Sequence, residues 1–420
     1  MNIVRDDNGQ VIVLVVLCMA ILLGFVALSI DVGQLLYTKV QLQTAADAAA
    51  FAGALEIQQC GTTANCAVMQ TAAKSAMSEN GLTADTFGIQ CAAASATGTT
   101  LTLNNGPCAL GASDPSFGNN NYVEAVVTKH QPTIFAGILG ISAVNVMARA
   151  EAGLVSSDYC LYISTGNTST GAGTAMTMNS GGQLDATCGI IDDSGATSAM
   201  WLNSGSHLSA TTIDVHGTYS YNGGAHYTPT PTNYAAAVAD PLSWVPRPTV
   251  GGCTNVQPIG SKGQVLNPGT YCGVNLNSGA SLTLNPGLYI MNGYINVGSG
   301  ATLSGAGVTL YFPSGTMQMN SGSTVNLTAP SSGTYAGILL YQSPSNSAGM
   351  NLNSGSASLW QGAIYLPGAT LTINSGGNAA AYTIIDVKSL IIDSGAKFNI
   401  ASDYSSLPGG SPARVTKLLE

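Results

Sequence analysis

Charged side chains are scarce in this 420-residue chain. Asp, Glu, Lys and Arg together make up 7% of the residues, whereas an ordinary soluble domain has about 25%. Only 11 Lys and Arg stand against 20 Asp and Glu, and the formal net charge is −9. A chain with so few basic residues cannot form the positive surface that follows nucleic-acid phosphates. We therefore expect no nucleic-acid partner.

The sequence also has few clusters of acidic residues. Catalysis by carboxylates needs such clusters. A glycosidase places two carboxylates around the scissile bond, and a lyase holds Ca²⁺ with several carboxylates beside a base. No Lys or Arg lies between Arg149 and Arg247. We expect no enzyme, no catalytic residue, no metal and no cofactor, with a polysaccharide lyase or hydrolase as the alternative. The acidic residues close enough in sequence to cluster are Asp185, Asp192, Asp193 and Asp214, and the histidines expected to be solvated loop residues are His207, His216 and His226.

Zinc-binding cysteine motifs are also missing. No C-x-x-C pair occurs and the four His are scattered, so disulfides are favoured over zinc. Cys18 lies inside an apolar run. Proximity alone suggests four local bridges among the remaining eight, which implies an oxidising compartment. These pairs are Cys60–Cys66, Cys91–Cys108, Cys160–Cys188 and Cys253–Cys272.

One long apolar run is present near the N-terminus. No charged residue occurs from Val11 to Ile30, and a helix of this length spans about 30 Å, the thickness of the hydrocarbon core of a bilayer. A signal peptide has a shorter core and a small-residue cleavage site, so an uncleaved transmembrane anchor is favoured. Arg5 and Lys39 indicate the orientation weakly. The cysteines place the C-terminal region on the periplasmic or extracellular side.

The motifs around the run resemble a known family. Asn8-Gly9-Gln10 precedes the run, Asp31-Val32-Gly33 ends it, and a helix reading L-Q-T-A-A-D-A-A-A follows at 42–50. Residues 8–54 are similar to the TadG-like N-terminal segment of Flp/Tad pilus-assembly proteins; a generic anchor with an Ala-rich stalk is the alternative. A type IV prepilin would carry Glu where Leu14 stands, which argues against polymerisation like the major pilin.

Residues 35–155 are predicted to form a small α+β domain beside the membrane. Apolar and alanine residues at helical spacing extend the anchor helix to about residue 54, and a second helix is expected at 66–79. Strands are expected near 99–103, 122–129 and 144–152, with a short helix at 131–140. Residues 122–153 also resemble the family's pattern of strand, P-T-x-F-A-x-x-L-G and closing strand, which implies an architectural role.

An Asn-Ser-Gly or Asp-Ser-Gly repeat dominates residues 156–420. Apolar residues stand three and one positions before the Asn and five after it, and successive turns are often about 21 residues apart. This period predicts a right-handed parallel β-helix, a solenoid in which Asn and Gly adopt left-handed turn conformations and Asn side chains stack along the axis. An antiparallel β-sandwich is the alternative. The predicted turn residues are Asn179, Asp193, Asn203, Asn277, Asn320, Asn353, Asn374 and Asp393.

The period is interrupted at about 216–263, where Pro and aromatic residues gather. A long irregular stretch is usually functional or a tether. Two interpretations are open: the aromatic rings stack on sugar rings, or they pack on the flank of the solenoid. Pieces such as Asp240-Pro241-Leu242 resemble domains that some TadG-like proteins carry. The aromatic residues are Tyr219, Tyr221, Tyr227, Tyr234 and Trp244.

The sequence thus predicts a mainly β protein: an anchor in residues 1–34, a TadG-like α+β domain in 35–155 and a β-helix in 156–420. The predicted function is that of a single-pass envelope protein of the Tad/Flp pilus system, displaying its solenoid for pilus assembly or adhesion. Its expected partners are the membrane, Tad pilus components and surface glycans. The alternatives are a polysaccharide-binding or polysaccharide-cleaving β-helix and a minor pilin.

Overall fold

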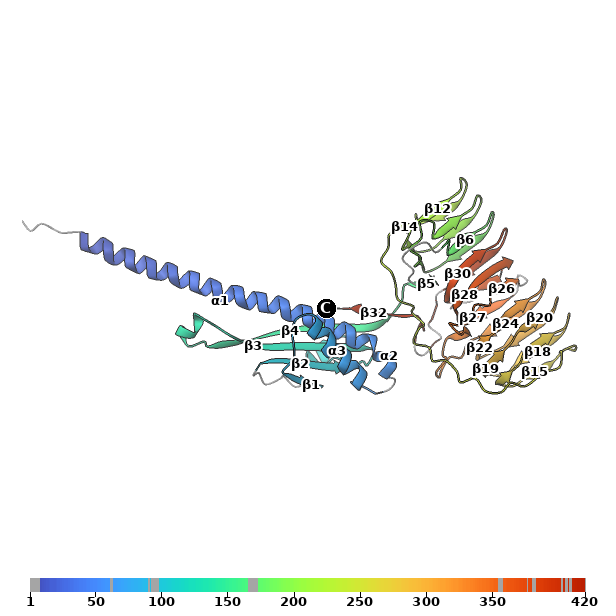
Figure 1. Cartoon of the computed structure of the whole chain (residues 1–420), viewed down its shortest axis with the longest axis horizontal. Coiled ribbons are helices and arrows are strands. Elements are labelled where there is room, and N and C mark those ends of the chain that lie inside the picture. The colour runs from blue at the N-terminus through green and yellow to red at the C-terminus, as the bar shows by residue number, and fades with distance from the viewer. Residues whose placement is uncertain are drawn as a thin grey trace, which may run out of the picture. The chain divides into compact units, whose positions relative to one another are not determined.

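The computed structural model describes residues 8–60, 63–89, 91, 98–164, 173–353, 358–375, 377–379, 383–401, 403–404, 407 and 410–419. The chain is mainly β with one long apolar N-terminal helix, as predicted (Figure 1). It divides into two compact units. Unit 1 comprises residues 1–155 and 416–420, and unit 2 comprises residues 156–415.

The long helix α1 (Asn8–Leu55) has two parts with different environments. Large apolar side chains between Ile12 and Ile30 are exposed, whereas Leu42 and the alanines after it are buried in the core of unit 1. Among the described residues, α1 is the one helix long and apolar enough to cross a membrane. The helices α2 (Ile57–Cys60) and α3 (Ala67–Glu79) follow, and α3 packs against α1.

A five-stranded sheet completes unit 1, in the order β1-β2-β3-β4-β32. Small residues such as Ala125 and Ala150 face the alanines of α1, so the helix approaches the sheet closely. The helix expected at 131–140 is a single 3-10 turn at the tip of the β3–β4 hairpin. The elements are β1 (Thr86–Gly88), β2 (Thr99–Asn105), η1 (Gly111–Ser113), β3 (Tyr122–Pro132), η2 (Ala136–Leu139), β4 (Ala143–Ser156) and β32 (Arg414–Leu418).

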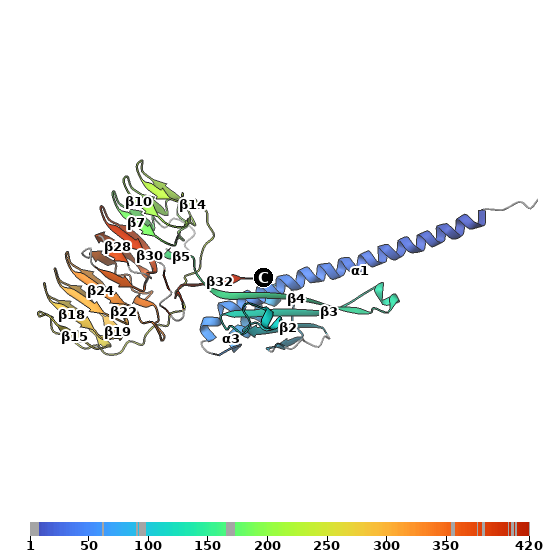
Figure 2. The same ribbon diagram turned by 180° about the vertical axis from the view of Figure 1, so that it is seen from behind.

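Unit 2 is built from short strands that pair in parallel in sheets of 10 and 17 strands (Figure 2). Strands that follow one another once around the unit are called a repeat below. Grouped by repeat, they are β5 (Tyr159–Ile163), β6 (Met176–Met178), β7 (Gln183–Ala186); β8 (Gly189–Asp192), β9 (Met200–Leu202), β10 (His207–Ser209); β11 (Ile213–Val215), β12 (Tyr219–Tyr221), β13 (His226–Thr228); β14 (Thr232–Asn233); β15 (Gln264–Leu266); β16 (Gly269–Tyr271), β17 (Val274–Leu276), β18 (Ser281–Leu284); β19 (Gly287–Asn292), β20 (Ile295–Val297), β21 (Thr302–Gly305); β22 (Val308–Ser314), β23 (Met317–Met319), β24 (Thr324–Thr328); β25 (Ile338–Gln342), β26 (Met350–Asn353), β27 (Leu359–Gln361); β28 (Ala363–Ser375), β29 (Gly377–Ala379); β30 (Ile385–Ile392) and β31 (Lys397–Ile400).

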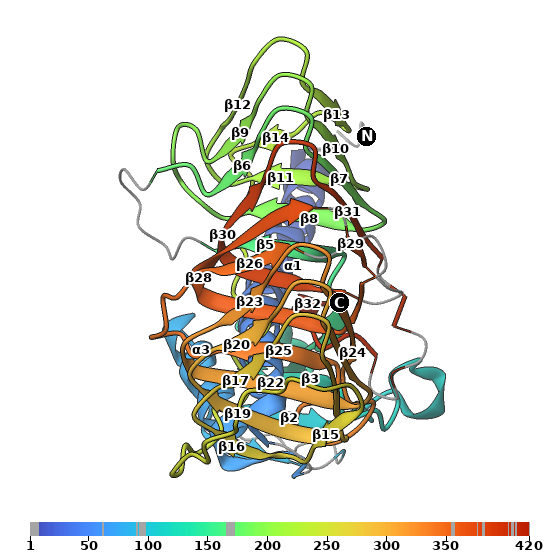
Figure 3. The same cartoon turned by 90° about the vertical axis from the view of Figure 1, so that its right-hand side faces the viewer.

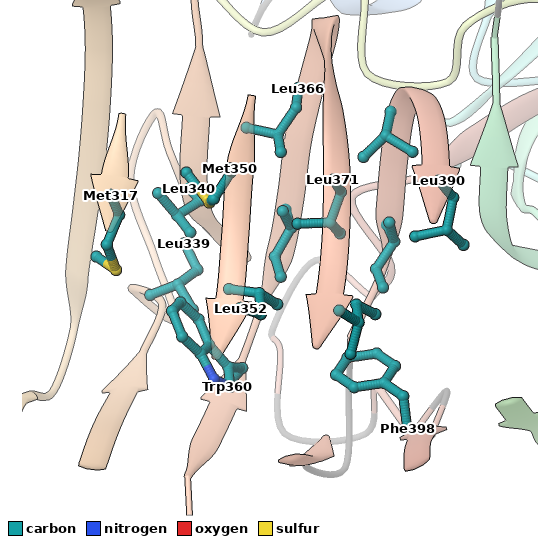
Figure 4. Close-up of a cluster of buried hydrophobic side chains, with 14 of the residues drawn as sticks. Met317, Leu339, Leu340, Met350, Leu352, Trp360, Leu366, Leu371, Leu390 and Phe398 are labelled. Atoms are coloured by element: carbon teal, nitrogen blue, oxygen red, sulfur yellow. The ribbon is translucent and has the colours of Figure 1, made fainter. Parts of the chain in front are cut away.

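Equivalent positions of neighbouring repeats lie in register. Leu282 of β18 pairs with Leu303 of β21, which pairs with Val325 of β24. The apolar positions of the sequence repeat therefore stack in columns and fill the interior, where Trp360 is among the largest fully buried side chains (Figure 4). Burying such columns is the main favourable contribution to the stability of the unit.

The repeats do not stack in chain order. The first repeat, β5–β7, pairs on one side with the second repeat and on the other with the last repeat, β30–β31. The chain winds from the middle of the stack to the end at β11–β14, passes through residues 234–263, and restarts at β15 at the opposite end. It then winds back until β30 and β31 meet β5–β7. In Figure 3 the green, red and yellow strands follow one another in that order.

The Asn-Ser-Gly and Asp-Ser-Gly turns whose glycines have a positive φ include those at Asn179, Asn203, Asn277 and Asp393. The φ angles of Gly181, Gly205, Gly279 and Gly395 are 77°, 76°, 73° and 74°, a conformation that costs little only for glycine. Asp193 was wrongly predicted to occupy this turn. It follows the first strand of its repeat, and its Oδ1 accepts a hydrogen bond from the Val238 amide at 3.1 Å.

The predicted interruption at 216–263 starts too early. Strands β12, β13 and β14 continue the stack as far as Asn233. The irregular part is therefore residues 234–263, called the crossing segment below. The period was lost in sequence because the turn at Asn222-Gly223-Gly224 replaces Asn-Ser-Gly.

Candidate functional site

Asp31 connects the end of the apolar helix to the tip of the β3–β4 hairpin. It is the one charged residue in the sequence between Asp7 and Lys39, and its side chain is 3% exposed. Its carboxylate accepts hydrogen bonds from the amides of Ile134, Phe135 and Ala136 at 2.9, 2.9 and 2.6 Å. Charge-assisted bonds of this kind are the stronger ones in proteins. They join the D-V-G and P-T-I-F-A motifs, which are distant in sequence.

A buried ionic network lies on the other face of the sheet of unit 1. Arg149 forms ion pairs with Asp114, Glu124 and Glu151. Glu124 is fully buried and also accepts a hydrogen bond from Asn104 Nδ2 at 3.0 Å. Burial raises the pKa of Glu124, but the bonds from Asn104, Arg149 and nearby amides hold it below its ordinary value. The network connects β3, β4 and the segment between β2 and β3. The sequence analysis did not predict it.

The eight paired cysteines form disulfides in the pairs expected from their order. In unit 2, Cys160–Cys188 joins β5 to the residue before β8. Cys253–Cys272 joins the crossing segment to the residue after β16. Cys18 is free and exposed on α1. Among the residues that the structure describes, no group of three or more His, Cys, Asp or Glu could hold a metal ion. The four bridges are Cys60–Cys66, Cys91–Cys108, Cys160–Cys188 and Cys253–Cys272.

Side chains of the turn residues form a hydrogen-bonded ladder across the junction of first and last repeats. Asn179 Nδ2 donates to Asp393 Oδ1 at 2.9 Å, and Asn203 Nδ2 donates to Asn179 Oδ1 at 3.4 Å. Asn222, which the sequence reading missed, extends the ladder to Asn203 at 3.0 Å.

The other predicted turn residues lie at the same corner in later repeats. Asn277 and Asn320 close their turns through backbone bonds from Ala280 and Ser323, each 3.1 Å long. Asn353 and Asn374 lie in β26 and β28. The following residues, 354–357 and 376, are outside the described residues.

Three of the five candidate aromatic residues gather at one end of the stack. The rings of Tyr219, Tyr221 and Tyr227 lie 5.5–5.9 Å apart, and Tyr221 is 53% exposed. Tyr234 and Trp244 belong to the crossing segment and lie elsewhere. Trp244 is half-buried, and its Nε1 donates to the Pro241 carbonyl at 3.1 Å. The structure therefore offers a surface cluster of three tyrosines.

The crossing segment is fastened to a column of stacked tyrosines on the flank of unit 2. The rings of Tyr311, Tyr341 and Tyr365 follow one another at 4.9 and 5.2 Å. Tyr341 Oη donates to the Val245 carbonyl at 3.3 Å, and Tyr365 Oη donates to Asp240 Oδ2 at 2.6 Å. Leu242 and Val245 are buried in the same cluster. Residues 240–245, including Trp244, therefore pack on the flank of unit 2, whereas Tyr234 is 79% exposed.

A pair of acids lies at this contact. Asp386 is fully buried in the strand position next to Tyr365, and Ser164 Oγ donates to its Oδ1 at 3.3 Å. Burial, followed by the charge and hydrogen bond of Asp240, raises the pKa of Asp386 well above its ordinary value. The raised pKa favours the protonated form of Asp386, so this buried contact need not hold two negative charges. The pair ties the crossing segment to the last repeat.

Of the acidic residues singled out in the sequence, Asp185, Asp192 and Asp214 occupy different faces. Asp192 is fully buried in the interior, while Asp214 pairs in register with outward-facing Ile191 and accepts a bond from Tyr159 Oη at 2.7 Å. Asp185 lies in the other sheet, 3.4 Å from His207. Of the other histidines, His216 Nδ1 lies 2.9 Å from the Ala235 carbonyl, and His226 is exposed on β13.

Replacing Asp192 with asparagine is expected to stabilise unit 2 at pH 8. Burial raises the pKa of Asp192 to about 7 in the folded state. The hydrogen bond from the Ser194 amide lowers this pKa, and the charge of Asp193 raises it. In the unfolded chain the pKa of an Asp is about 3.9. Between these values the folded state holds a proton that the unfolded state has lost. Wild-type stability therefore falls by up to about 1.4 kcal/mol per pH unit as pH rises, and this contribution is gone above about pH 7.

Asparagine keeps the Oδ1 acceptor for the Ser194 amide, 3.0 Å away, without the charge. Thermal unfolding of the full chain at pH 5 and pH 8 tests the prediction, with Asp393→Asn as control because Asn is the usual residue at that turn. The melting temperature of Asp192→Asn should fall less between pH 5 and 8 than those of wild type and Asp393→Asn. An identical fall in all three would contradict it.

These features define a class: a mainly β protein whose parallel-strand unit follows a long apolar helix and a small disulfide-bonded domain. Residues 9–56 match the family described as Putative Flp pilus-assembly TadE/G-like. This bears out the resemblance seen in the anchor motifs, and the match ends before the hairpin and unit 2. No curated protein and no solved structure matches the chain.

Proposed function

We propose that this protein is a single-pass, membrane-anchored envelope protein of the Tad/Flp pilus system. Residues 11–30 span the membrane, the residues before them lie on the cytoplasmic side, and the region after them lies on the periplasmic or extracellular side. The observation that carries the proposal is the TadE/G-like match on a helix that continues unbroken from an apolar segment into the core of unit 1. Four disulfides support an oxidising compartment for the region after the helix.

Unit 2, in this proposal, is a right-handed parallel β-helix that serves as a rigid displayed body for pilus assembly or surface adhesion. Parallel strands in equivalent register, left-handed glycine turns and the Asn179 ladder support the β-helix. The right hand follows the general preference of crossovers between parallel strands. A body with few charges and many polar side chains suits contact with Tad pilus components or surface glycans.

Shearing piliated cells tests the function. The chain is expected to stay in the membrane pellet, to resist alkaline extraction, and to be required for piliation or adhesion. Alkaline phosphatase fused to its C-terminus should be active, because that enzyme needs an oxidising compartment. Recovery of the chain with the sheared fibres would instead support a minor pilin, and an inactive fusion would contradict the outward orientation.

The tyrosine cluster of β12 and β13 favours a second candidate, binding of surface polysaccharide. Tyr221 is the exposed member of the cluster, and its ring stacks on that of Tyr219. An exposed aromatic ring can pack against the face of a sugar. Tyr221→Ala should then lower retention on the bound polysaccharide, and Tyr294→Ala, also half-exposed, should not. Should Asp192→Ala or Asp193→Ala abolish polysaccharide turnover without unfolding unit 2, the enzyme alternative would replace both candidates.

A further inference from the structure

The tip of the β3–β4 hairpin, residues 133–142, has the composition of a membrane-contacting loop. It carries no charged residue. Ile134, Ile138 and Ile141 are 60%, 83% and 52% exposed, which is a large apolar surface for a short loop in water. Isolated exposed apolar residues are common, but a contiguous group at the end of one hairpin marks an interaction surface.

Hydrogen bonds fix the position of the tip along the axis of α1. The amides of Ile134, Phe135 and Ala136 donate to Asp31, which follows the last residue of the apolar run. Beyond Asp31, Thr38 Oγ1 contacts Gln131 Oε1 at 3.4 Å, so β3 runs along the helix away from the apolar part. In both Figures 1 and 2 the hairpin tip lies beside α1 part of the way along the helix.

From Asp31 the tip extends back along the apolar run. Gly24, Ala27 and Leu28 of α1 line one hollow together with Phe135, Ala136 and Ile138 of the tip. Gly24 precedes Asp31 by seven residues (31 − 24), or about 10 Å of helix. The tip therefore lies beside the last 10 Å or so of a segment that is about 30 Å long.

A shift of α1 along the bilayer normal that would leave the tip in water is opposed by the charged residues at both ends of the apolar run. Asp6 and Asp7 precede the run, and Asp31 follows it. The run is about 30 Å long as a helix, which equals the thickness of the hydrocarbon core. Any placement that buries the run brings Ile138 to the level of the lipid chains nearest the headgroups.

We propose that the β3–β4 hairpin tip inserts into the outer leaflet side of the bilayer beside α1, with Ile134, Ile138 and Ile141 in contact with lipid. The partner is the lipid surface itself, and the argument is continuity with the membrane-spanning helix, so the inference rests on the proposed anchor. The first charges beyond the tip, Lys39 on α1 and Lys129 on β3, then lie toward the phosphates. Two attachments in place of one restrain the tilt of unit 1 on the membrane.

Depth-dependent quenching of tryptophan fluorescence tests the proposal on the full chain. The protein is reconstituted in vesicles of phosphatidylcholine and phosphatidylglycerol whose acyl chains carry bromine either near the headgroups or near the bilayer centre. Ile138→Trp reports the tip and Val16→Trp reports the anchor. Leu110→Trp is the matched control, 57% exposed in the same unit. The three native tryptophans lie in unit 2, and their signal is subtracted as background.

Ile138→Trp is expected to lose fluorescence with shallow bromine more than with deep bromine, Val16→Trp with deep bromine, and Leu110→Trp with neither. If Val16→Trp is quenched while Ile138→Trp matches Leu110→Trp, the tip proposal is overturned and the anchor stands. If Ile138→Trp escapes both bromines but is shielded from a soluble quencher, a protein partner covers the tip, and the lipid proposal is again overturned. If Val16→Trp is not quenched, the anchor itself fails.

Discussion

Replacing Arg149 with alanine is expected to lower the free energy of unfolding of unit 1 by about 3–5 kcal/mol, the usual cost of removing one partner of a buried ion pair. Arg149 is the cation shared by three carboxylates, and the side chains of Glu124, Asp114 and Glu151 are 0%, 3% and 7% exposed. Without the guanidinium, Glu124 keeps its bond from Asn104 but stays buried as an uncompensated charge.

Hydrogen exchange of the β2–β4 amides measures this effect, because all three tryptophans lie in unit 2 and leave unit 1 silent in fluorescence. Arg149→Lys should lose part of the stability, since an ammonium keeps the charge but not the planar fork of donors. Lys129→Ala on the neighbouring strand should change little. Equal exchange rates in wild type and Arg149→Ala would show that the network does not stabilise the fold.

The same network sets an acid limit for unit 1. The pKa of Glu124 is held below its ordinary value, so its contribution to stability is present above the unfolded pKa of about 4.3 and is lost as pH falls through the folded pKa. Unit 2 has the opposite dependence through Asp192 and Asp386, whose raised pKa values favour the folded state at lower pH.

Phe398→Ala is expected to lower the free energy of unfolding of unit 2 by about 3–5 kcal/mol, the range for a large aromatic side chain removed from a core. Phe398 is 1% exposed. It lies in β31, where it pairs in register with Leu184 of the first repeat and Gly377 of the preceding one. The cavity would open at the junction where the chain's first and last repeats meet (Figure 4).

Denaturant unfolding followed by tryptophan fluorescence measures this loss. Tyr294→Ala is the control, because Tyr294 is 48% exposed in the same unit and a surface substitution usually changes stability by less than about 0.5 kcal/mol. A loss no larger for Phe398→Ala than for Tyr294→Ala would mean that the junction relaxes around the missing ring.

The junction also explains why unit 2 should behave as one cooperative body. Ser164 and Asp386 are 222 positions apart in sequence and share a hydrogen bond. In an ordinary repeat array each repeat contacts only its sequence neighbours. Here the first repeat has a strand partner on one side only until the last repeat has folded. Contacts between residues far apart in sequence must therefore form before the stack is complete.

Local signals in the sequence determined most of the elements. The apolar run and the alanine-rich stretch after it specified α1, because a helix needs only spacing and length to be recognised. The Asn-Ser-Gly motif specified the turns, since left-handed backbone is a property of single residues such as Gly181 and Gly279. Cysteine order was sufficient for the disulfides because each bridge closes a short loop, of 28 positions at most.

The tertiary structure alone decided which repeats are neighbours and which polar groups meet. Every repeat presents the same pattern, so a period of about 21 residues shows that strands stack on equivalent strands but not that β30 stacks on β5. The hydrogen bonds of Asp31 to the hairpin tip, the Arg149 network and the contact of Asp240 with Asp386 join residues far apart in sequence, where no periodic pattern indicates the partner. Burial determines these pairings, because a buried charged or polar group is stable only where another group pairs or hydrogen-bonds with it.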